Sequence, residues 1–168
     1  TTYGTAFGQP YGFGTVFKFT PPGTLTNLVT FYGTNGMRPI GGVTLSPDGF
    51  LYGTTSSGGI SNLGTLFRIT TNGQLTTLVS FVGANGASPA SRLTLGRDGW
   101  LYGTSQLGGI SNLGTIFRLN TNGAFSSLAS FVGTNGANPY SELVQAGDNN
   151  FYGTTVNGGT FGLGAVFR

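Results

Sequence analysis

The sequence predicts an all-β fold made of tandem repeats of about 50 residues, each a four-stranded antiparallel sheet like a β-propeller blade. Internal repetition is the main reason. The phrase LYGTTSSGGISNLGTLFRIT at 51–70 returns as LYGTSQLGGISNLGTIFRLN at 101–120 and as FYGTTVNGGTFGLGAVFR from residue 151. The second reason is glycine: there are 32 glycines among 168 residues, and no window shows a helical hydrophobic period.

The repeat holds its phase along the whole chain. Tyr-Gly pairs recur at steps of 49 or 50 residues, and a Gly-x-x-Phe element recurs every 50 residues, starting at Gly14, Gly64, Gly114 and Gly164. The sequence therefore predicts a single repeat domain over 1–168. Its units are approximately 1–41 (partial), 42–91, 92–141 and 142–168 (partial).

The strands of a unit follow from alternation and turn signals. In the unit 92–141, residues 92–96 alternate inward-facing Leu93 and Leu95 with polar neighbours, and an Asp-Gly turn leads into 100–105. Residues 114–120 form the third expected strand, and an Asn-Gly turn leads into the fourth at 124–131. The middle strands carry large side chains on both faces, as expected for a sheet packed between two like sheets. A β-helix would usually have shorter coils and would lack two Asx-Gly hairpins per repeat.

Composition excludes several classes of function. Charged residues make up 7% of the chain, against about 25% in an average soluble domain. The net charge of +3 is too small for the basic stripe of a nucleic-acid-binding protein. Apolar runs fall short of the ~20 residues of a membrane-spanning helix, so neither a nucleic-acid partner nor membrane insertion is expected.

Catalysis is not expected either. The chain has no histidine and no cysteine, so it lacks a conventional triad, an imidazole base and thiolate ligands, and we expect no cofactor and no metal. Asp48, Asp98 and Asp148 occupy equivalent positions beside turns, where an aspartate caps main-chain amides. Among the acidic residues only Glu142 breaks the repeat, since the other units have Gly42 and Arg92 at this position.

A basic side chain also recurs once per unit, at Lys18, Arg68, Arg118 and Arg168. Such a series either contacts an acidic polymer or serves the sheet itself, by reaching water from strand edges or by pairing with the turn aspartates. We favour the structural interpretation.

The stretch DGFLYGTTSSGGISNLGTLFRITTNGQLTTLVSFVGANGASP at 48–89 resembles the Gloeo/Verruco (GloVer) tandem repeat of bacterial proteins. The shared motifs are Tyr-Gly-Thr-Thr, a Gly-Gly pair, a Gly-Thr-hydrophobic-Phe element and a Leu-x-x-Phe before a Gly- and Pro-containing loop, and the resemblance covers essentially the whole chain. It implies an exported or surface-attached protein and no known catalytic residues. The sequence departs from the pattern in showing no sorting tail and in replacing the first Gly-Gly pair with FGQPYG.

Two repeated residue types are candidate ligand contacts. Tyrosine rings repeated around a propeller can stack on sugars, although packing between blades, with the hydroxyl bonded to a carbonyl, is the favoured interpretation. Asparagines near the Gly-Gly turns extend this set. Equal weak sites would bind a carbohydrate by avidity, so a multivalent glycan-binding (lectin-like) propeller is the alternative function. The candidates are Tyr52, Tyr102, Tyr152, Asn62, Asn112 and Asn157.

The strand order at the two ends leads to the main functional expectation. The chain opens with the last three strands of a unit and ends with the first three, about three and a half repeats, whereas a closed propeller normally needs at least about four blades. The terminal sheets would then need cover from a like surface. We expect a non-enzymatic structural protein, extracellular or at the cell surface, that associates with itself in a ring or filament; otherwise the chain is a window from a longer array. The expected interface comprises Phe7, Phe17, Phe19, Phe151, Phe161 and Phe167.

Overall fold

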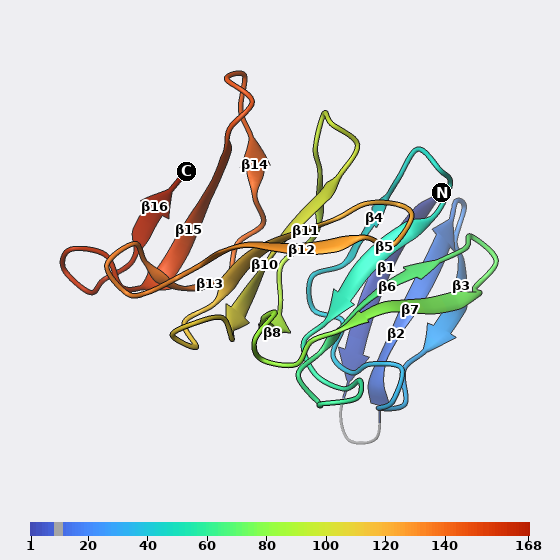
Figure 1. The fold of residues 1–168 in the computed structure, drawn as a ribbon. Coiled ribbons are helices and arrows are strands. Elements are labelled where there is room, and N and C mark those ends of the chain that lie inside the picture. The colour runs from blue at the N-terminus through green and yellow to red at the C-terminus, as the bar shows by residue number, and fades with distance from the viewer. Residues whose placement is uncertain (9–11) are drawn as a thin grey trace.

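The fold is a row of four antiparallel sheets, as Figure 1 shows. The computed structural model describes residues 1–8 and 12–168, with Phe7 and Gly8 described in their main chain only. Across these ranges every regular element is a strand and none is a helix. The expected all-β repeat fold is confirmed, and we call the four sheets blades 1 to 4.

The blades recur along the chain, but the short strands at 87–89 and 137–139 pair with strands of the following blade although they lie inside the predicted units 42–91 and 92–141. In the described residues blade 1 has three strands, blade 2 has four, blade 3 has five and blade 4 has four. Blade 1 contains β1 (Thr2–Gly8), β2 (Gly12–Thr20) and β3 (Thr24–Thr30), and blade 2 contains β4 (Val43–Leu45), β5 (Leu51–Thr55), β6 (Thr65–Ile69) and β7 (Leu75–Ser80). Blade 3 contains β8 (Ala87–Pro89), β9 (Thr94–Leu95), β10 (Leu101–Leu107), β11 (Thr115–Leu119) and β12 (Phe125–Ser130). Blade 4 contains β13 (Ala137–Pro139), β14 (Val144–Gln145), β15 (Phe151–Asn157) and β16 (Ala165–Phe167).

The first strand of blades 3 and 4 is split in two, a feature that the sequence pattern does not predict. Strands β8 and β9 both pair with β10, with Pro89 opposite Ser105 and Leu95 opposite Leu101. Proline has no N–H to donate to a ladder, and Ser88 before it has a left-handed φ of 52°, so regular pairing cannot continue through this point. Strands β13 and β14 repeat the arrangement on β15.

Glycines fix the entry into the third strand of each blade. Gly64 and Gly114 have φ of 103° and 110°, as expected for a turn before this strand. A Cβ on Gly64 would lie 2.3 Å from the carbonyl oxygen of Thr55, so the neighbouring main chain leaves no room for a side chain. The recurring Gly-x-x-Phe element is therefore required by the backbone.

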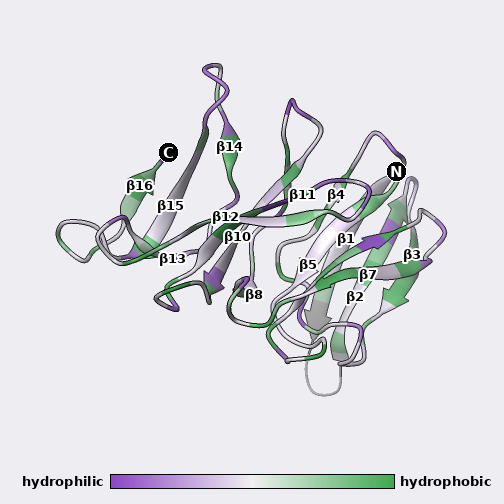
Figure 2. Cartoon of the chain, in the orientation of Figure 1, coloured by the Kyte–Doolittle hydropathy of each residue, from purple (hydrophilic) through white to green (hydrophobic). Residues whose placement is uncertain are grey.

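The core lies between adjacent blades. The phenylalanine that follows the last strand of one blade packs on the phenylalanine in the third strand of the next, with Phe31 and Phe67 centroids 5.3 Å apart and Phe81 and Phe117 centroids 5.4 Å apart. Phe67 and Phe117 are fully buried by these contacts. Figure 2 shows hydrophobic segments on the strands and hydrophilic residues at the tip of the β14–β15 hairpin. Each internal sheet is thus covered on both sides, as a propeller blade is.

Candidate functional site

The hairpin between β4 and β5, and its counterparts in blades 3 and 4, holds a repeated Asp–Tyr contact. Asp48 accepts the main-chain N–H of Phe50 at 3.1 Å with Oδ1 and the hydroxyl of Tyr52 at 2.7 Å with Oδ2. The same pair of contacts recurs at Asp98 with Tyr102 and at Asp148 with Tyr152. The aspartates cap their turns, and each hydroxyl meets a carboxylate where a main-chain carbonyl was expected. Tyr52 is fully buried and Tyr102 nearly so, which leaves those two rings no surface for a ligand.

The environment keeps these tyrosines protonated. Burial, followed by the hydrogen bond to Asp48, raises the pKa of Tyr52 to about 12, and the nearby Arg68 offsets part of this rise. Burial is also the first cause of the raised pKa of Tyr102, whereas the hydrogen bond to Asp148 comes first for Tyr152. Phenols with raised pKa values act as stable hydrogen-bond donors at neutral pH and not as nucleophiles.

In blades 2 and 3 the guanidinium group of the basic series lies over an aromatic ring. The Arg68 guanidinium carbon is 4.7 Å from the centroid of Phe50, and that of Arg118 is 4.2 Å from Trp100. Such cation–π contacts stabilise a partly desolvated guanidinium. Arg68 also donates to the Thr121 carbonyl of blade 3 at 3.4 Å. These contacts support the structural interpretation of the series in blades 2 and 3.

The Gly-Gly loops are turns stabilised by their own asparagines. Asn62 Oδ1 accepts the N–H of Gly58 at 3.0 Å, and Asn112 repeats the contact with Gly108 at 2.8 Å. Both asparagines have left-handed φ, of 56° and 55°. Asn157 occupies a different repeat position and donates to Asn138 Oδ1 at 3.1 Å. The asparagine candidates are therefore not a set of equal sites.

Among the described residues, the sheet faces at the two ends of the row have no blade packed against them. We call the outer face of blade 1, with Phe17, Phe19 and Leu25, the incoming face. Phe19 is 38% exposed there, whereas its counterparts Ile69 and Leu119 are fully buried. The side chain of Phe7 lies outside the described residues.

The opposite end carries what we call the outgoing face, with Val144, Tyr152 and Val166 on blade 4. Val166 is 76% exposed, whereas its counterpart Leu66 in blade 2 is fully buried. These three side chains line a shallow hollow of about 360 Å³. In blades 2 and 3 the equivalent space is filled by the next blade.

The structure corrects two of the expected interface residues at this end. The ring of Phe151 stacks on Tyr102 at 4.0 Å, and the ring of Phe167 packs on Phe131 at 5.0 Å, so both point back into blade 3. Side chains alternate between the faces of a strand, and the neighbouring Tyr152 and Val166 point outward instead. Phe161 is 87% exposed, on the loop between β15 and β16.

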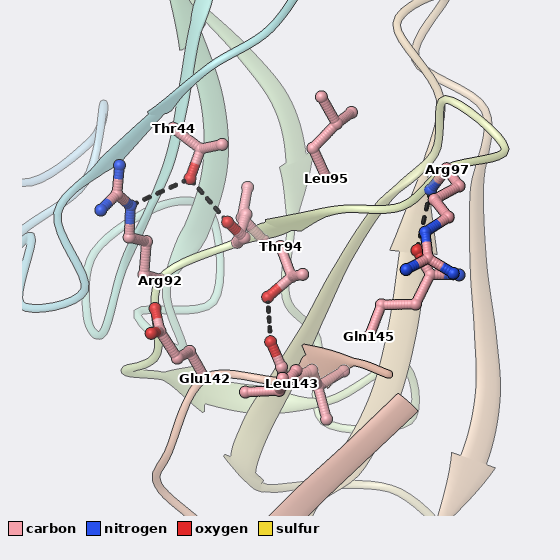
Figure 3. A pocket seen from close by; sticks show the side chains of 10 residues that line it. Thr44, Arg92, Thr94, Leu95, Arg97, Glu142, Leu143 and Gln145 are labelled. Atoms are coloured by element: carbon pink, nitrogen blue, oxygen red, sulfur yellow. Dashed lines mark hydrogen bonds between the residues drawn. The ribbon is translucent and has the colours of Figure 1, made fainter. Parts of the chain in front are cut away.

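A polar cleft of about 410 Å³ runs along the first strands of blades 2 to 4, and Figure 3 shows its lining. Threonine hydroxyls link these strands by hydrogen bonds. Thr44 Oγ1 donates to the Leu93 carbonyl at 2.6 Å, and Thr94 Oγ1 donates in the same way to the Leu143 carbonyl. The cleft is lined by Thr44, Arg92, Leu93, Thr94, Leu95, Arg97, Glu142, Leu143, Val144 and Gln145.

Charged and amide side chains of this inner cleft are anchored across blades. Arg92 Nε donates to Thr44 Oγ1 at 3.3 Å. The N–H of Arg97 donates to Gln145 Oε1, and its Nη1 donates to Asn149 Oδ1, each at 2.9 Å. Glu142 was recognisable in the sequence as a break in the repeat. That residues 50 positions apart line one cleft could not be predicted. Arg92 and Arg97 also depart from the repeat, and this departure is the signal in the sequence that could have identified the cleft.

Residues 1–8 and 12–168 contain no group of three His, Cys, Asp or Glu side chains that could hold a metal ion. The same ranges contain no helix that is long and apolar enough to cross a membrane.

Known structures share this fold. A virginiamycin B lyase from Staphylococcus aureus is 18% identical with a TM-score of 0.62, and the match covers 92% of this chain and 48% of that one. A streptogramin B lyase is 17% identical with a TM-score of 0.60, covering 92% and 47%, and a protein assigned as a gluconolactonase is 20% identical with a TM-score of 0.57, covering 84% and 48%. The chain therefore spans about half the length of these structures, and at such identities the likeness concerns the fold alone.

No curated protein matches the chain by sequence. The model of the Gloeobacter/Verrucomicrobia repeat matches residues 1–168, which confirms the resemblance carried by the Tyr-Gly-Thr-Thr and Gly-Gly motifs. The chain belongs to the Gloeobacter/Verrucomicrobia repeat family.

Proposed function

We propose that this repeat protein is a non-enzymatic, extracellular structural module that associates with copies of itself, the outgoing face of one copy packing on the incoming face of the next. One observation carries the proposal. Phe19 and Val166 are exposed on these two faces, whereas their counterparts in blade 2, Ile69 and Leu66, are fully buried. Repeat units that stack on their neighbours within a chain can stack in the same way between chains.

The apolar content of both faces is needed for stable association. Fully burying one large apolar side chain contributes roughly 1.5–3 kcal/mol, whereas association costs roughly 4–15 kcal/mol. One residue is therefore insufficient, but the two faces together offer several. These are Phe17, Phe19 and Leu25 on the incoming face and Val144, Tyr152 and Val166 on the outgoing face.

The intermolecular contact would resemble the internal contacts without copying every one. Thr44 and Thr94 each form a hydrogen bond to the next blade, but the equivalent residue on the outgoing face is Val144, which has no hydroxyl. The joint would therefore rely on apolar packing there. A head-to-tail contact of this kind gives a ring if the rotation closes and a filament if it does not. The similar solved structures are about twice as long as this chain, so a ring of two copies would match their length.

Light scattering coupled to size-exclusion chromatography tests the proposal. We expect the wild-type chain to elute above the 17.3 kDa of one copy, and Val166→Glu to elute as a monomer because a buried unpaired carboxylate is costly. Val82→Glu is the matched control, since Val82 is also exposed but lies in the loop after β7. Circular dichroism should show both variants folded. A wild-type monomer, or equal effects of the two substitutions, would contradict the proposal.

Most of the residues expected to contact a glycan are buried or already hydrogen-bonded within the chain. Tyr52 and Tyr102 are buried, and the side-chain oxygens of Asn62 and Asn112 accept hydrogen bonds within their own loops. Tyr152 lies on the outgoing face, where the proposed association would cover it.

A further inference from the structure

Charged residues that depart from the repeat converge on the inner cleft. The chain has seven basic and four acidic residues, and most of them are the repeated turn aspartates and the repeated basic series. The charges outside both series are Arg38, Arg92, Arg97 and Glu142. Of these, all but Arg38 line the inner cleft. In a chain with 7% charged residues, this concentration marks a place where the repeat serves something other than packing.

The cleft offers two guanidinium groups supported from neighbouring blades. Arg92 Nε is bonded to Thr44 of blade 2, which orients the guanidinium without neutralising it. Arg97 is held against blade 4 by Gln145 and Asn149. In Figure 3 the two arginines lie toward opposite sides of the view, with Thr94 and Leu143 between them. Guanidinium groups recognise carboxylates through paired N–H donors.

The remaining lining favours a ligand with hydroxyl groups and few negative charges. The lining threonines, Gln145 and Glu142 supply hydrogen-bond donors and acceptors. Glu142 repels densely charged anions, because like charges brought together in a site are unfavourable. None of the lining residues is aromatic, so the cleft lacks the stacking surface typical of single-stranded nucleic-acid sites.

We propose that the inner cleft binds a carboxylated carbohydrate, a sugar chain containing uronate residues, with Arg92 and Arg97 contacting its carboxylates and Glu142 accepting sugar hydroxyls. Sparse carboxylates spaced by hydroxyl-bearing rings match two arginines separated by neutral polar residues. The two arginines belong to neither the incoming nor the outgoing face, so their contacts do not require self-association, whereas Glu142 and Val144 line both the inner cleft and the hollow of the outgoing face. The proposed site also differs from the expected tyrosine and asparagine contacts, none of which lines this cleft.

Titration calorimetry with trigalacturonate tests the proposal, with galacturonate as the single-sugar arm and a neutral galactose trisaccharide as the uncharged arm. Wild-type protein should bind trigalacturonate, less tightly at high salt, and should not bind the neutral sugar. Binding of the trimer but not of the single sugar identifies a chain as the ligand, and binding of both identifies the uronate itself.

Two variants locate the site. Arg92→Gln should weaken trigalacturonate binding by about tenfold or more, as expected for a lost charged hydrogen bond. Arg38→Gln removes the same charge outside the cleft and should leave binding unchanged. NMR shifts of the Arg92 side-chain N–H in the wild-type protein provide a readout that does not depend on the stability of the variant. Absence of binding, equal losses in the two variants, or an unperturbed Arg92 signal at saturation would overturn the proposal.

Discussion

Replacing Phe117 with alanine measures how strongly one blade is held by the next. Phe117 is fully buried, and its ring packs on Phe81 of blade 2 at 5.4 Å and on Phe125 of its own blade at 5.5 Å. The ring also covers Gly103, where an added Cβ would lie 2.7 Å from the ring, so the surroundings cannot collapse easily into the space left. We expect the free energy of unfolding to fall by roughly 3–5 kcal/mol, as for other buried phenylalanines.

The repeat supplies a matched control for this substitution. Phe167 occupies the same position in blade 4 and packs on Phe131 at 5.0 Å, but it is only partly buried, and among the described strands β16 pairs with β15 alone, whereas β11 pairs with β10 and β12. Phe167→Ala should therefore cost clearly less. Thermal unfolding followed by circular dichroism should show a loss of roughly 6–20 °C in Tm for Phe117→Ala. Equal losses for the two variants would refute the idea that burial within and between blades sets the cost.

Two further predictions concern the backbone and the repeated tyrosines. Gly114→Val should lower the free energy of unfolding by at least about 1–3 kcal/mol, because Gly114 has a φ of 110° and a Cβ there would lie 2.5 Å from the Ser105 carbonyl oxygen; an unchanged Tm would contradict this. Tyr52 keeps its proton up to a pKa of about 12 in the folded chain, against an ordinary value of 10.0, so the unfolded state releases this proton first as pH rises. Stability measured by urea unfolding should therefore fall between about pH 10 and 12, and Tyr52→Phe should show a shallower fall; an identical pH dependence in both proteins would exclude this cause.

The period, the turns and the core of the fold could be predicted from the sequence because each depends on local chemistry. The left-handed conformation at Gly64 needs a glycine, and the Asp-Gly turn needs the cap that Asp48 provides. Large side chains on both faces of the middle strands predicted a sheet covered on both sides, and in these strands Phe67 and Phe117 are fully buried. Because the sequence repeats, each of these local inferences applies to the other blades as well.

What the sequence did not predict depends on contacts between distant segments. The split first strand follows from the left-handed Ser88 beside Pro89, and neither the dihedral nor the pairing of both halves with β10 is visible in a pattern. The inner cleft requires β4, β9 and β14 to lie side by side. Phe151 and Phe167 pack against rings of blade 3, so the opposite face of blade 4 is the exposed one. The aromatic residues of the sequence alone suggested that the face carrying Phe151 and Phe167 is exposed.

Directed disulfide formation between copies tests the self-association most directly, because the chain contains no cysteine of its own. Phe19→Cys places a thiol on the incoming face, and Val166→Cys places one on the outgoing face. When the two variants are mixed under mild oxidation, we expect the mixed disulfide between them to dominate over either symmetric product, because the proposed contact is head-to-tail. A Val82→Cys variant controls for random collision. Symmetric disulfides in equal or greater yield, or no more cross-linking than Val82→Cys shows, would contradict it.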